Sequence, residues 1–328
     1  MIFDIRVPAT TANIGPGFDS LGLALSLCNR FAVEPAARTS VEGCEEKYRG
    51  PENLFLAAMR RAAELLGTRA PDVRLSIDAD IPTARGLGSS AAMIVGGATA
   101  ALLLDEKRNP ELPLSAEERR FILDAAAELE GHPDNAAPAA LGGFCASIIG
   151  GPGRASGTAR ITCARCEVDP SWSFHAFVPP FELPTREARA ALPAAVSRRD
   201  AVFNVGRAAL VALAFEQGDA ALLGAACDDR LHQPYRKAMI PGYDEVMDAC
   251  LHGGAAAAWL SGAGPTLMAL AVGAEASDRL AAAMEPVLAS RQEGPWRRLR
   301  LSAESSGVTF AARESGASPT RLKKVECL

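Results

Sequence analysis

Residues 82–97, Pro-Thr-Ala-Arg-Gly-Leu-Gly-Ser-Ser-Ala-Ala-Met-Ile-Val-Gly-Gly, form the stretch around which the rest of the chain is organised. The alternation of apolar and polar residues just before it, at 73–78, predicts a half-buried strand. The apolar run 91–95 within it predicts a buried helix. Glycines let backbone N–H groups approach an anion closely, and the first N–H groups of a helix favour negative charge. The stretch therefore predicts a phosphate-binding loop between a strand and a helix.

Two other interpretations of the glycine stretch stay open, and a third is excluded. Gly86, Gly88 and Ala91 also fit the loose form of the dinucleotide fingerprint, with Asp105 at the distance expected of a ribose-binding acid. Asp105, however, follows an Ala/Leu-rich run that suits a helix better than a second strand. The glycines also fit a simple turn that caps a core helix, although such a cap does not need two further serines. The P-loop is excluded because the chain contains no Gly-Lys-Ser/Thr.

The composition is that of an ordinary globular protein. The chain has 328 residues, 48% hydrophobic and 22% charged, a length that suits two domains. Its net charge of −5 gives nucleic-acid binding no electrostatic support. No apolar run approaches a membrane span and the first residues do not form a signal peptide, so we expect neither a membrane nor a nucleic-acid partner. The eight cysteines follow no disulfide framework and suit reduced thiols, which predicts a cytoplasmic location.

A glycine-rich segment marks the expected division of the chain. Gly150-Gly151-Pro152-Gly153 is the predicted seam between a nucleotide-binding N-terminal domain over residues 1–150 and a second domain over residues 151–310. From about Ala311 onward the sequence is polar and has no periodicity. We therefore expect a loosely held tail over residues 311–328.

Two polar segments outside the glycine stretch are dense in side chains that bind ligands. A predicted strand at 3–7 leads into Pro8–Gly22, a run rich in Thr, Asn, Gly and Pro that predicts a loop with unusual backbone demands. Asn13 and Asp19 are its candidate binding residues, although both would serve equally well as caps of turns. A helix that starts with a capping box delivers the second segment, Glu130–Asn135, at its C-terminal turn.

In these motifs and their order the sequence resembles the GHMP kinases, and within that superfamily the homoserine kinases. The motifs that carry the resemblance are Pro8–Gly22, Pro82–Ala92, Glu130–Asn135, Pro234–Arg236 and Ser261–Thr266. The first discriminates best, because mevalonate and galactose kinases have a Lys or Arg with Gly-Glu-His there. The resemblance implies a two-domain α+β fold: an N-terminal domain like the second domain of ribosomal protein S5, with a left-handed βαβ crossover, and a ferredoxin-like C-terminal domain. It also implies the reaction, transfer of a phosphoryl group from ATP to the side-chain hydroxyl of L-homoserine, a step of threonine biosynthesis.

The resemblance implies which residues bind the nucleotide and its metal ion. Backbone N–H groups from Gly86 to Ala91 would hold the β- and γ-phosphates. Mg²⁺ prefers hard oxygen ligands, which the Ser90 hydroxyl and the Glu130 carboxylate would supply. The residues implied to contact ATP are Asn53, Pro82, Arg85, Gly86, Leu87, Gly88, Ser89, Ser90, Ala91 and Ala92.

The charges of an amino-acid substrate match a second implied group. Asp19 would bind the ammonium, and Arg189 and Arg236 would bind the carboxylate. The implied substrate residues are Asn13, Asp19, His132, Asn135, Thr185, Arg189, Arg236 and Gly262, with Asn13, Asn135 and Arg189 as catalytic candidates. The resemblance implies that no carboxylate reaches the substrate hydroxyl as a base, which is chemically acceptable because phosphoryl transfer through a loose transition state asks mainly for alignment and charge stabilisation. Whether any side chain acts as base stays open. The contribution of Asp134 stays open.

Two other functions stay open. A kinase for another small alcohol, such as mevalonate, a sugar or shikimate, would share the fold and differ only in its substrate pocket. A non-catalytic nucleotide-binding protein is disfavoured because both candidate Mg²⁺ ligands, Ser90 and Glu130, are present. The expected partner is the small-molecule substrate, and the oligomeric state stays open, with a homodimer as one expectation.

Overall fold

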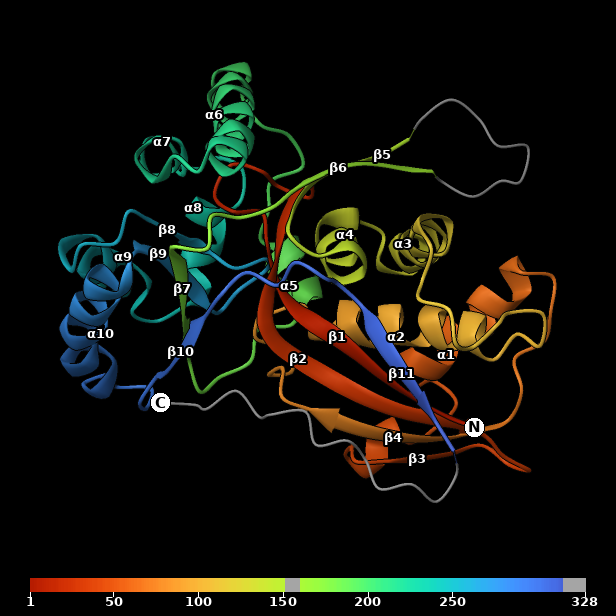
Figure 1. Ribbon diagram of the computed structural model, residues 1–328. Helices are drawn as coiled ribbons and strands as arrows, with labels where there is room; N and C mark the ends of the chain where they lie inside the picture. The colour runs from red at the N-terminus through yellow and green to blue at the C-terminus, as the bar shows by residue number, and fades with distance from the viewer. Residues whose placement is uncertain (151–159, 315–328) are drawn as a thin grey trace.

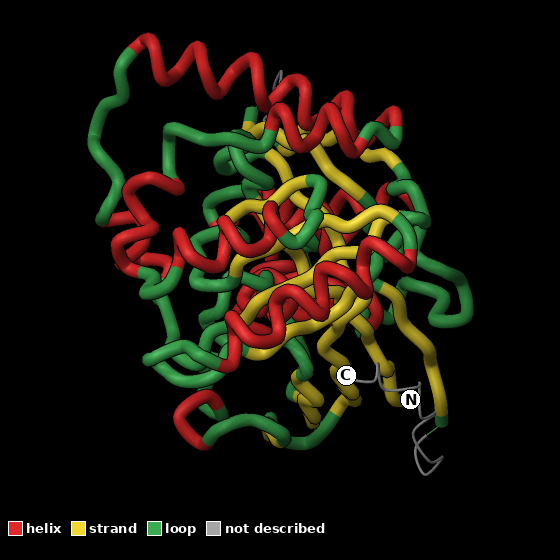
Figure 2. Tube along the Cα trace, turned by 90° about the vertical axis from the view of Figure 1, so that its left-hand side faces the viewer, coloured by secondary structure: helices red, strands yellow, loops and turns green. Residues whose placement is uncertain are grey.

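The computed structural model describes residues 1–150 and 160–314, and within them the chain forms two packed units of helices and strands (Figure 1). The first unit is a seven-stranded sheet with helices α1 to α4 on one side, and the second is a four-stranded sheet covered by α9 and α10. In the turned view of Figure 2, helices lie in front of the strands they cover. The architecture is the two-part α+β fold expected from the sequence.

The larger sheet is built on the long hairpin of its first two strands. Its strands are β1 (Ile2–Ala12), β2 (Leu21–Pro35), β3 (Ser40–Glu42), β4 (Val73–Ala79), β5 (Phe144–Ile149), β6 (Ile161–Cys166) and β11 (Thr309–Arg313). They lie in the order β11-β1-β2-β4-β3, with β5 paired to β2 and β6 paired to β5. All pairs are antiparallel except β3 and β4, which are parallel and joined through α1 (Leu54–Leu65). The left-handed sense expected of this crossover stays a prediction.

The smaller sheet has the expected ferredoxin-like topology. Its strands are β7 (Trp172–Val178), β8 (Ala257–Leu260), β9 (Leu267–Val272) and β10 (Arg297–Leu301). They lie in the antiparallel order β10-β7-β9-β8. Along the chain β7 is followed, after a helical insertion within residues 179–242, by α9-β8-β9-α10-β10, which completes the βαββαβ pattern of that fold. The remaining elements are α2 (Ser89–Leu103), α3 (Ala116–Glu130), α4 (Pro133–Leu141), α5 (Thr185–Ala190), α6 (Arg198–Gln217), α7 (Ala220–Ala226), α8 (Gln233–Arg236), α9 (Tyr243–His252), α10 (Ala274–Ala289) and the short 3₁₀ turns η1 (Glu46–Tyr48) and η2 (Lys237–Met239).

Local sequence signals place the helices that carry the site. The predicted strand and helix around the glycine stretch are β4 and α2, and α3 begins with the predicted capping box of Ser115 and Glu118. Helix α2 is buried on most sides and packs closely against α1. Gly97 makes that approach possible, because a Cβ atom there would lie 2.1 Å from the Phe55 carbonyl oxygen.

The segment Pro8–Gly22 is only partly the loop that its composition predicts. Its first five residues complete β1, with a bulge between Pro8 and Ala9, and pair with β2. The prediction of an unusual backbone is confirmed in the remaining turn, residues 13–20, where Asn13, Ile14 and Asp19 all have positive φ angles. Composition alone does not predict that residues 8–12 form a strand, because their pairing with β2 overrides the local turn preference of Thr and Pro.

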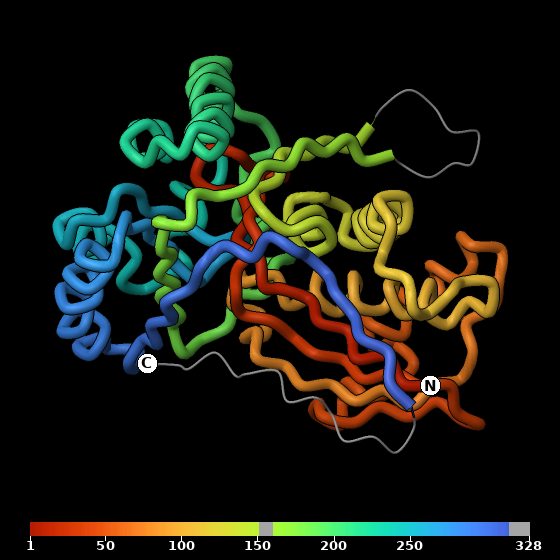
Figure 3. Tube along the Cα trace, in the orientation of Figure 1, coloured from red at the N-terminus to blue at the C-terminus, as the bar shows by residue number. Residues whose placement is uncertain are grey.

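The sheets do not follow the proposed domain boundaries. A boundary at residue 150 separates β6 from β5, to which β6 is paired along its whole length. Figure 3 shows the C-terminal strand β11 lying along the N-terminal strand β1, in the register Ile2↔Arg313 to Arg6↔Thr309. Strand pairing between distant segments leaves no mark in local composition, and it argues for assigning both strands to the first unit. Of the predicted seam and tail, residues 151–153 and 315–328 lie outside the described residues.

Aromatic side chains of β5, α6 and β7 pack against one another. Phe144 of β5 stacks on Phe215 of α6 with ring centroids 4.1 Å apart, and Trp172 of β7 meets Phe215 edge-on at 5.2 Å. Aromatic contacts of this kind add to the gain from burying the rings. These contacts join a strand of each sheet through α6.

Candidate active site

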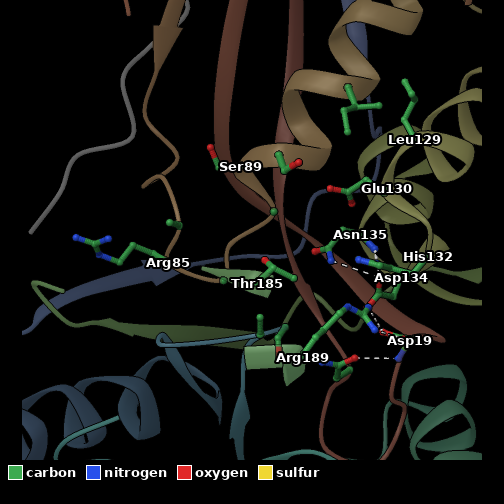
Figure 4. A pocket seen from close by; sticks show the side chains of 18 of the residues that line it. Asp19, Arg85, Ser89, Leu129, Glu130, His132, Asp134, Asn135, Thr185 and Arg189 are labelled. Carbon is green, nitrogen blue, oxygen red and sulfur yellow. Dashed lines mark hydrogen bonds and ion pairs between the residues drawn. The ribbon is translucent and has the colours of Figure 1, made fainter. Parts of the chain in front are cut away.

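A cavity of about 300 Å³ lies between the two units, beside the first turn of α2 (Figure 4). Its walls come from the 13–20 turn, the glycine loop, the end of α3, α5, α8 and the turn that follows β8. The predicted site residues that line it are Asn13, Asp19, Arg85, Gly86, Gly88, Ser89, Ser90, Glu130, His132, Asn135, Thr185, Arg189, Arg236 and Gly262. The fold therefore brings segments far apart in the sequence to one place.

Five residues predicted to contact ATP are not among the residues that line this cavity: Asn53, Pro82, Leu87, Ala91 and Ala92. The side chains of Leu87, Ala91 and Ala92 are buried in the core, so only their backbone is available to a ligand. The Asn53 side chain caps α1 by accepting hydrogen bonds from the N–H groups of the helix start, and it donates to the Tyr48 carbonyl. Its side chain thus serves the fold, and a nucleoside contact through Asn53 stays a prediction.

The glycine loop has the geometry that its sequence demands. Gly86 and Gly88 have φ angles of +77° and +71°, a region that favours glycine, and Gly88 is the residue that caps α2. A Cβ atom at Gly88 would lie 1.9 Å from the Thr10 hydroxyl oxygen, and one at Gly86 would lie 2.4 Å from the Ser261 carbonyl oxygen. Both glycines are therefore required by their backbone angle and by their close neighbours. Ser89 and Ser90, at the start of α2, line the cavity, and the first N–H groups of a helix favour an anion.

The glycine loop is tied to the C-terminal unit by two side chains. The Ser261 hydroxyl donates to the Gly86 carbonyl at 2.6 Å. The Arg85 guanidinium donates to the carbonyls of Pro179 and Pro180, at 3.1 and 2.8 Å, and Figure 4 shows it pointing away from Ser89. The Arg85 side chain thus anchors the loop to the second unit and is occupied in that contact.

Ser90 and Glu130 lie at the end of the cavity that is next to the start of α2. The Ser90 hydroxyl lies within hydrogen-bonding range of the Glu130 carboxylate. The Oε2 atom of Glu130 is buried and has no hydrogen-bond partner among the described residues. Burial raises the pKa of this carboxyl. A buried carboxylate oxygen with an open side is a site that a cation would complete.

The charged side chains gather at the other end of the cavity. Arg189 donates from both terminal nitrogens to Asp19, at 3.0 and 2.8 Å, in a two-pronged ion pair. Arg236 is buried beside them, and burial, followed by the nearby charge of Arg189, lowers its pKa to about 10. The Phe18 ring lies under both guanidinium groups, 5.7 Å from that of Arg189 and 5.3 Å from that of Arg236. This end of the pocket thus brings the Asp19 carboxylate and two guanidinium groups together, with the Asp134 carboxylate close to Asp19.

Asn13 and Gly262 hold the walls of this end in place. Asn13 donates to the Gly262 carbonyl at 2.8 Å and accepts from the Asp19 backbone N–H at 3.0 Å. The Gly262 carbonyl also accepts from Arg236 at 3.0 Å. The predicted catalytic candidate Asn13 therefore uses its amide to position Asp19 and the turn after β8.

The middle of the pocket is formed by the start of α4. His132 Nδ1 lies 2.5 Å from Asp134 Oδ1, and the same oxygen accepts from the Asn135 backbone N–H at 3.0 Å. Burial works against a charged His132, but the hydrogen bond and charge of Asp134 outweigh it and raise the pKa of the ring. Asn135 accepts from the Thr10 hydroxyl at 2.7 Å, and its amide nitrogen donates to Asp134 Oδ1 at 3.4 Å at the edge of the pocket. Asp19, His132 and Asp134 approach one another closely enough to hold a metal ion, yet Asp19 and His132 already have charged partners.

Comparison with known proteins matches both halves of the chain to one family. Residues 53–143 match the family described as GHMP kinases N terminal domain, and residues 211–287 match GHMP kinases C terminal. The homoserine kinase of Clostridium botulinum strain Langeland is 41% identical over 81% of this chain and 85% of its own length. The chain belongs to the GHMP kinases. The homoserine kinase of Moorella thermoacetica is likewise 42% identical, over 82% of this chain and 87% of its own length.

Solved structures of GHMP kinases share the fold. A homoserine kinase from Cytophaga hutchinsonii superposes with a TM-score of 0.80 at 24% identity, covering 94% of this chain and 97% of that one. A putative homoserine kinase from Listeria monocytogenes has a TM-score of 0.73 at 30% identity, covering 95% and 100%. Mevalonate kinase from Methanococcus jannaschii, at 0.62 and 13% identity over 92% and 98%, shares the fold alone. As a GHMP kinase, the chain is a phosphotransferase that takes ATP as its phosphoryl donor.

The sequence analysis missed two aromatic residues of the charged end. Phe18 stands between Gly17 and Asp19 in the first motif. Its role could not be predicted from the motif, because it depends on contacts with two arginines of α5 and α8. His232 stacks on Phe18 with ring centroids 5.4 Å apart and lies two residues before the fourth motif. A histidine one turn before a predicted ligand arginine is the signal that could have found it.

Proposed function

We propose that this GHMP kinase transfers the γ-phosphoryl group of ATP to the side-chain hydroxyl of L-homoserine, giving O-phospho-L-homoserine for threonine biosynthesis. The observation that carries the proposal is the division of the pocket into two ends. Figure 4 places Ser89, at the anion site of α2, at one end and Asp19 with Arg189 at the other, with Thr185 and Asn135 between. Curated relatives named homoserine kinase at about 40% identity support the same assignment.

The charged end suits the head group of an amino acid. Asp19 offers a carboxylate to an ammonium group, and Arg189 and Arg236 offer guanidinium groups to a carboxylate. In the free protein the Asp19 carboxylate and the Arg189 guanidinium neutralise each other. A zwitterion also has no net charge, so its binding leaves the net charge of this end of the pocket unchanged. An alcohol without the ammonium group, such as mevalonate, would gain nothing from Asp19.

The residues present fit a Mg²⁺ ion at Ser90 and Glu130. The unpartnered and buried Oε2 of Glu130 is the feature that argues for a cation there. When bound, Mg²⁺ would neutralise charge on the phosphate oxygens. Ser90 and Glu130 would hold it, and the N–H groups of the glycine loop would orient the phosphate chain.

The residues around the substrate hydroxyl would contribute by positioning that hydroxyl more than by removing its proton. The amide of Asn135 lies at the edge of the pocket and would align the hydroxyl by a hydrogen bond. The Oδ1 atom of Asp134 accepts from His132 and from Asn135, which ties this carboxylate to the wall of the pocket. A loose transition state needs little help from a base, so the hydroxyl proton can pass directly to an oxygen of the phosphoryl group as the O–P bond forms and the bond to ADP breaks.

We further propose that the enzyme acts in the cytoplasm. Seven cysteines of the described residues are free thiols, as expected in a reducing compartment. In residues 1–150 and 160–314, no helix combines the length and the apolar character that crossing a membrane requires.

A homodimer is proposed through the outer face of α6. Four apolar side chains on this helix are exposed: Val202 (66%), Val205 (71%), Leu210 (41%) and Leu213 (47%). Arg207, the only charged residue between them, lies over the Phe203 ring, so the face carries little charge and can pair with a second copy of itself. Sedimentation should give twice the chain mass for the unmodified protein and the single mass for Val205→Asp; a monomeric unmodified protein would contradict the dimer.

An ADP-release assay on single substrates tests the proposed function. L-homoserine, mevalonate, galactose and shikimate would each be offered with ATP and Mg²⁺. We expect turnover of L-homoserine to exceed that of the other alcohols by at least about a hundredfold, since each lost charged contact costs about 1.5–3 kcal/mol. Comparable turnover of mevalonate or a sugar would favour the alternative of a kinase for another small alcohol.

A further inference from the structure

His232 occupies a buried position between the 13–20 turn and the charged end of the pocket. It is fully buried and directly precedes α8. Its Nε2 atom lies 2.8 Å from the Gly15 carbonyl oxygen, and its Nδ1 atom lies 3.3 Å from Nη1 of Arg236. Its ring is stacked on Phe18 at an interplanar angle of 25°. One side chain therefore contacts both the 13–20 turn, at Gly15 and Phe18, and the pocket residue Arg236.

These contacts fix the protonation of the ring. A carbonyl oxygen only accepts, so Nε2 must carry the proton that it shares with Gly15. A guanidinium only donates, so Nδ1 must accept from Arg236 and carries no proton. The ring is therefore neutral, and burial lowers the pKa of His232, which agrees with that state. Asp229 Oδ2, 3.6 Å from Nε2, also favours a proton on that nitrogen.

The segment that carries His232 is itself rigidly held. Asp229 Oδ2 accepts from the backbone N–H groups of His232 and Gln233, at 3.0 and 2.7 Å. Its Oδ1 accepts from Asn204 at 2.7 Å, and Asn204 also donates to the Pro16 carbonyl at 3.1 Å. Two successive carbonyls of the 13–20 turn, those of Gly15 and Pro16, thus accept hydrogen bonds from His232 and Asn204 of the C-terminal unit.

Arg236 is oriented by the same arrangement. Its Nε donates to the Ala188 carbonyl at 3.3 Å, and its Nη1 donates to Gly262 at 3.0 Å and faces His232. These contacts leave Nη2 for a ligand in the pocket. Without an acceptor at His232 Nδ1, Nη1 would lose one of its two partners and the planar group could turn.

We propose that His232 is a positioning residue for the amino-acid end of the pocket, holding the turn that presents Asp19 through Gly15 and setting the plane of Arg236. These contacts of His232 all lie away from the phosphate end of the pocket, so replacing His232 should affect the binding of the amino acid. The identity of the substrate rests on the proposed function, whereas the two hydrogen bonds of His232 do not.

Two partial replacements separate the two hydrogen bonds. His232→Gln keeps an N–H donor near the position of Nε2 but removes the acceptor for Arg236, and His232→Asn keeps an acceptor near Nδ1 but removes the donor to Gly15. We expect each to raise KM for homoserine about fivefold or more, and His232→Ala about thirtyfold or more, on the scale of one and two lost hydrogen bonds. The kcat value and KM for ATP should change less than about twofold, because His232 contacts only the amino-acid end of the pocket. A general structural loss would instead raise KM for both substrates. His252→Gln, at an exposed position on α9, is the matched control and should leave all constants unchanged.

The outcomes distinguish the inference from the proposed function. An unmodified enzyme that does not phosphorylate homoserine refutes both. Turnover by the unmodified enzyme, with KM for homoserine unchanged in the Gln and Asn variants or with KM for ATP raised equally, refutes the role of His232 alone. If His232→Ala does not fold, the two partial variants, each keeping one hydrogen bond, still give the result. In a double-mutant cycle, His232→Gln and Arg236→Lys should lower log kcat/KM by less together than the sum of the two, and strict additivity would contradict a shared contact.

Discussion

Removing the charge of Asp19 should separate substrate binding from folding. In the free protein both Asp19 oxygens are bonded to Arg189, at 3.0 and 2.8 Å, and the two side chains are 33% and 36% exposed. An ion pair this exposed contributes about 0–1 kcal/mol to stability. For Asp19→Asn we therefore expect the melting temperature to fall by no more than about 4 °C, the shift that 1 kcal/mol produces in a chain of this size.

The effect on homoserine should be much larger. A hydrogen bond to a charged partner contributes about 1.5–3 kcal/mol, so loss of the Asp19 charge should lower kcat/KM for homoserine by about ten- to a hundredfold. KM for ATP should hardly change, because Asp19 lies at the opposite end of the pocket from Ser89 (Figure 4). With 4-hydroxybutyrate, which lacks the ammonium group, the unmodified enzyme should react poorly and the variant about equally poorly.

Steady-state kinetics and thermal melts of both proteins test this reasoning. Asp278→Asn is the matched control, because it removes a similar ion pair, at 2.8 Å from Arg300, on an exposed surface of the C-terminal unit. That control should keep normal kinetics. The reasoning fails if Asp19→Asn melts early yet phosphorylates homoserine normally, since Asp19 would then serve only the turn.

Three further predictions follow from other parts of the structure. Ser90→Ala and Glu130→Gln should each lower kcat by at least about tenfold, and their double mutant by less than the product of the two if they share one Mg²⁺ ion; strictly multiplicative losses would argue against a shared ion. Arg236→Lys should raise KM for homoserine while KM for ATP stays the same, because an ammonium cannot reproduce the guanidinium contacts, and an equal rise in both would contradict its placement at the amino-acid end. Burial lowers the pKa of His175 from 6.5 to about 4, so between these pH values the unfolded chain binds a proton that the folded chain does not, and stability should fall as the pH falls. Urea unfolding should show His175→Gln losing less stability than the unmodified protein between those limits, by about 1–3 kcal/mol, and parallel losses would refute the assignment.

Local physical chemistry made part of this fold predictable. Gly86 and Gly88 stand where positive φ angles and close neighbours leave no room for a side chain, and the capping box at Ser115 marks the true start of α3. Such features depend on a few adjacent residues, so the sequence reveals them directly. The ferredoxin-like unit and the charged end of the pocket, by contrast, were expected from the family resemblance.

Long-range pairing explains what the sequence could not show. Strand β11 returns to β1 across almost the whole chain, and a polar segment near residue 311 gives no sign of that partner. Arg85 sits in the glycine loop and invites a role at the phosphate, yet its guanidinium binds carbonyls of the loop after β7. The mutual neutralisation of Asp19 and Arg189 joins residues of different units, and only the folded chain brings them together.

A competition experiment tests the central claim most directly. An equimolar mixture of L-homoserine, mevalonate, galactose and shikimate would be incubated with the enzyme and limiting ATP, and the phosphorylated products would be resolved by ³¹P NMR. The product ratio equals the ratio of kcat/KM values, which is the measure of specificity. The arrangement of Asp19, Arg189 and Arg236 predicts a single phosphomonoester, O-phospho-L-homoserine, formed in equal amount to ADP. A second phosphorylated alcohol in comparable yield, or ADP without phosphohomoserine, would contradict the account.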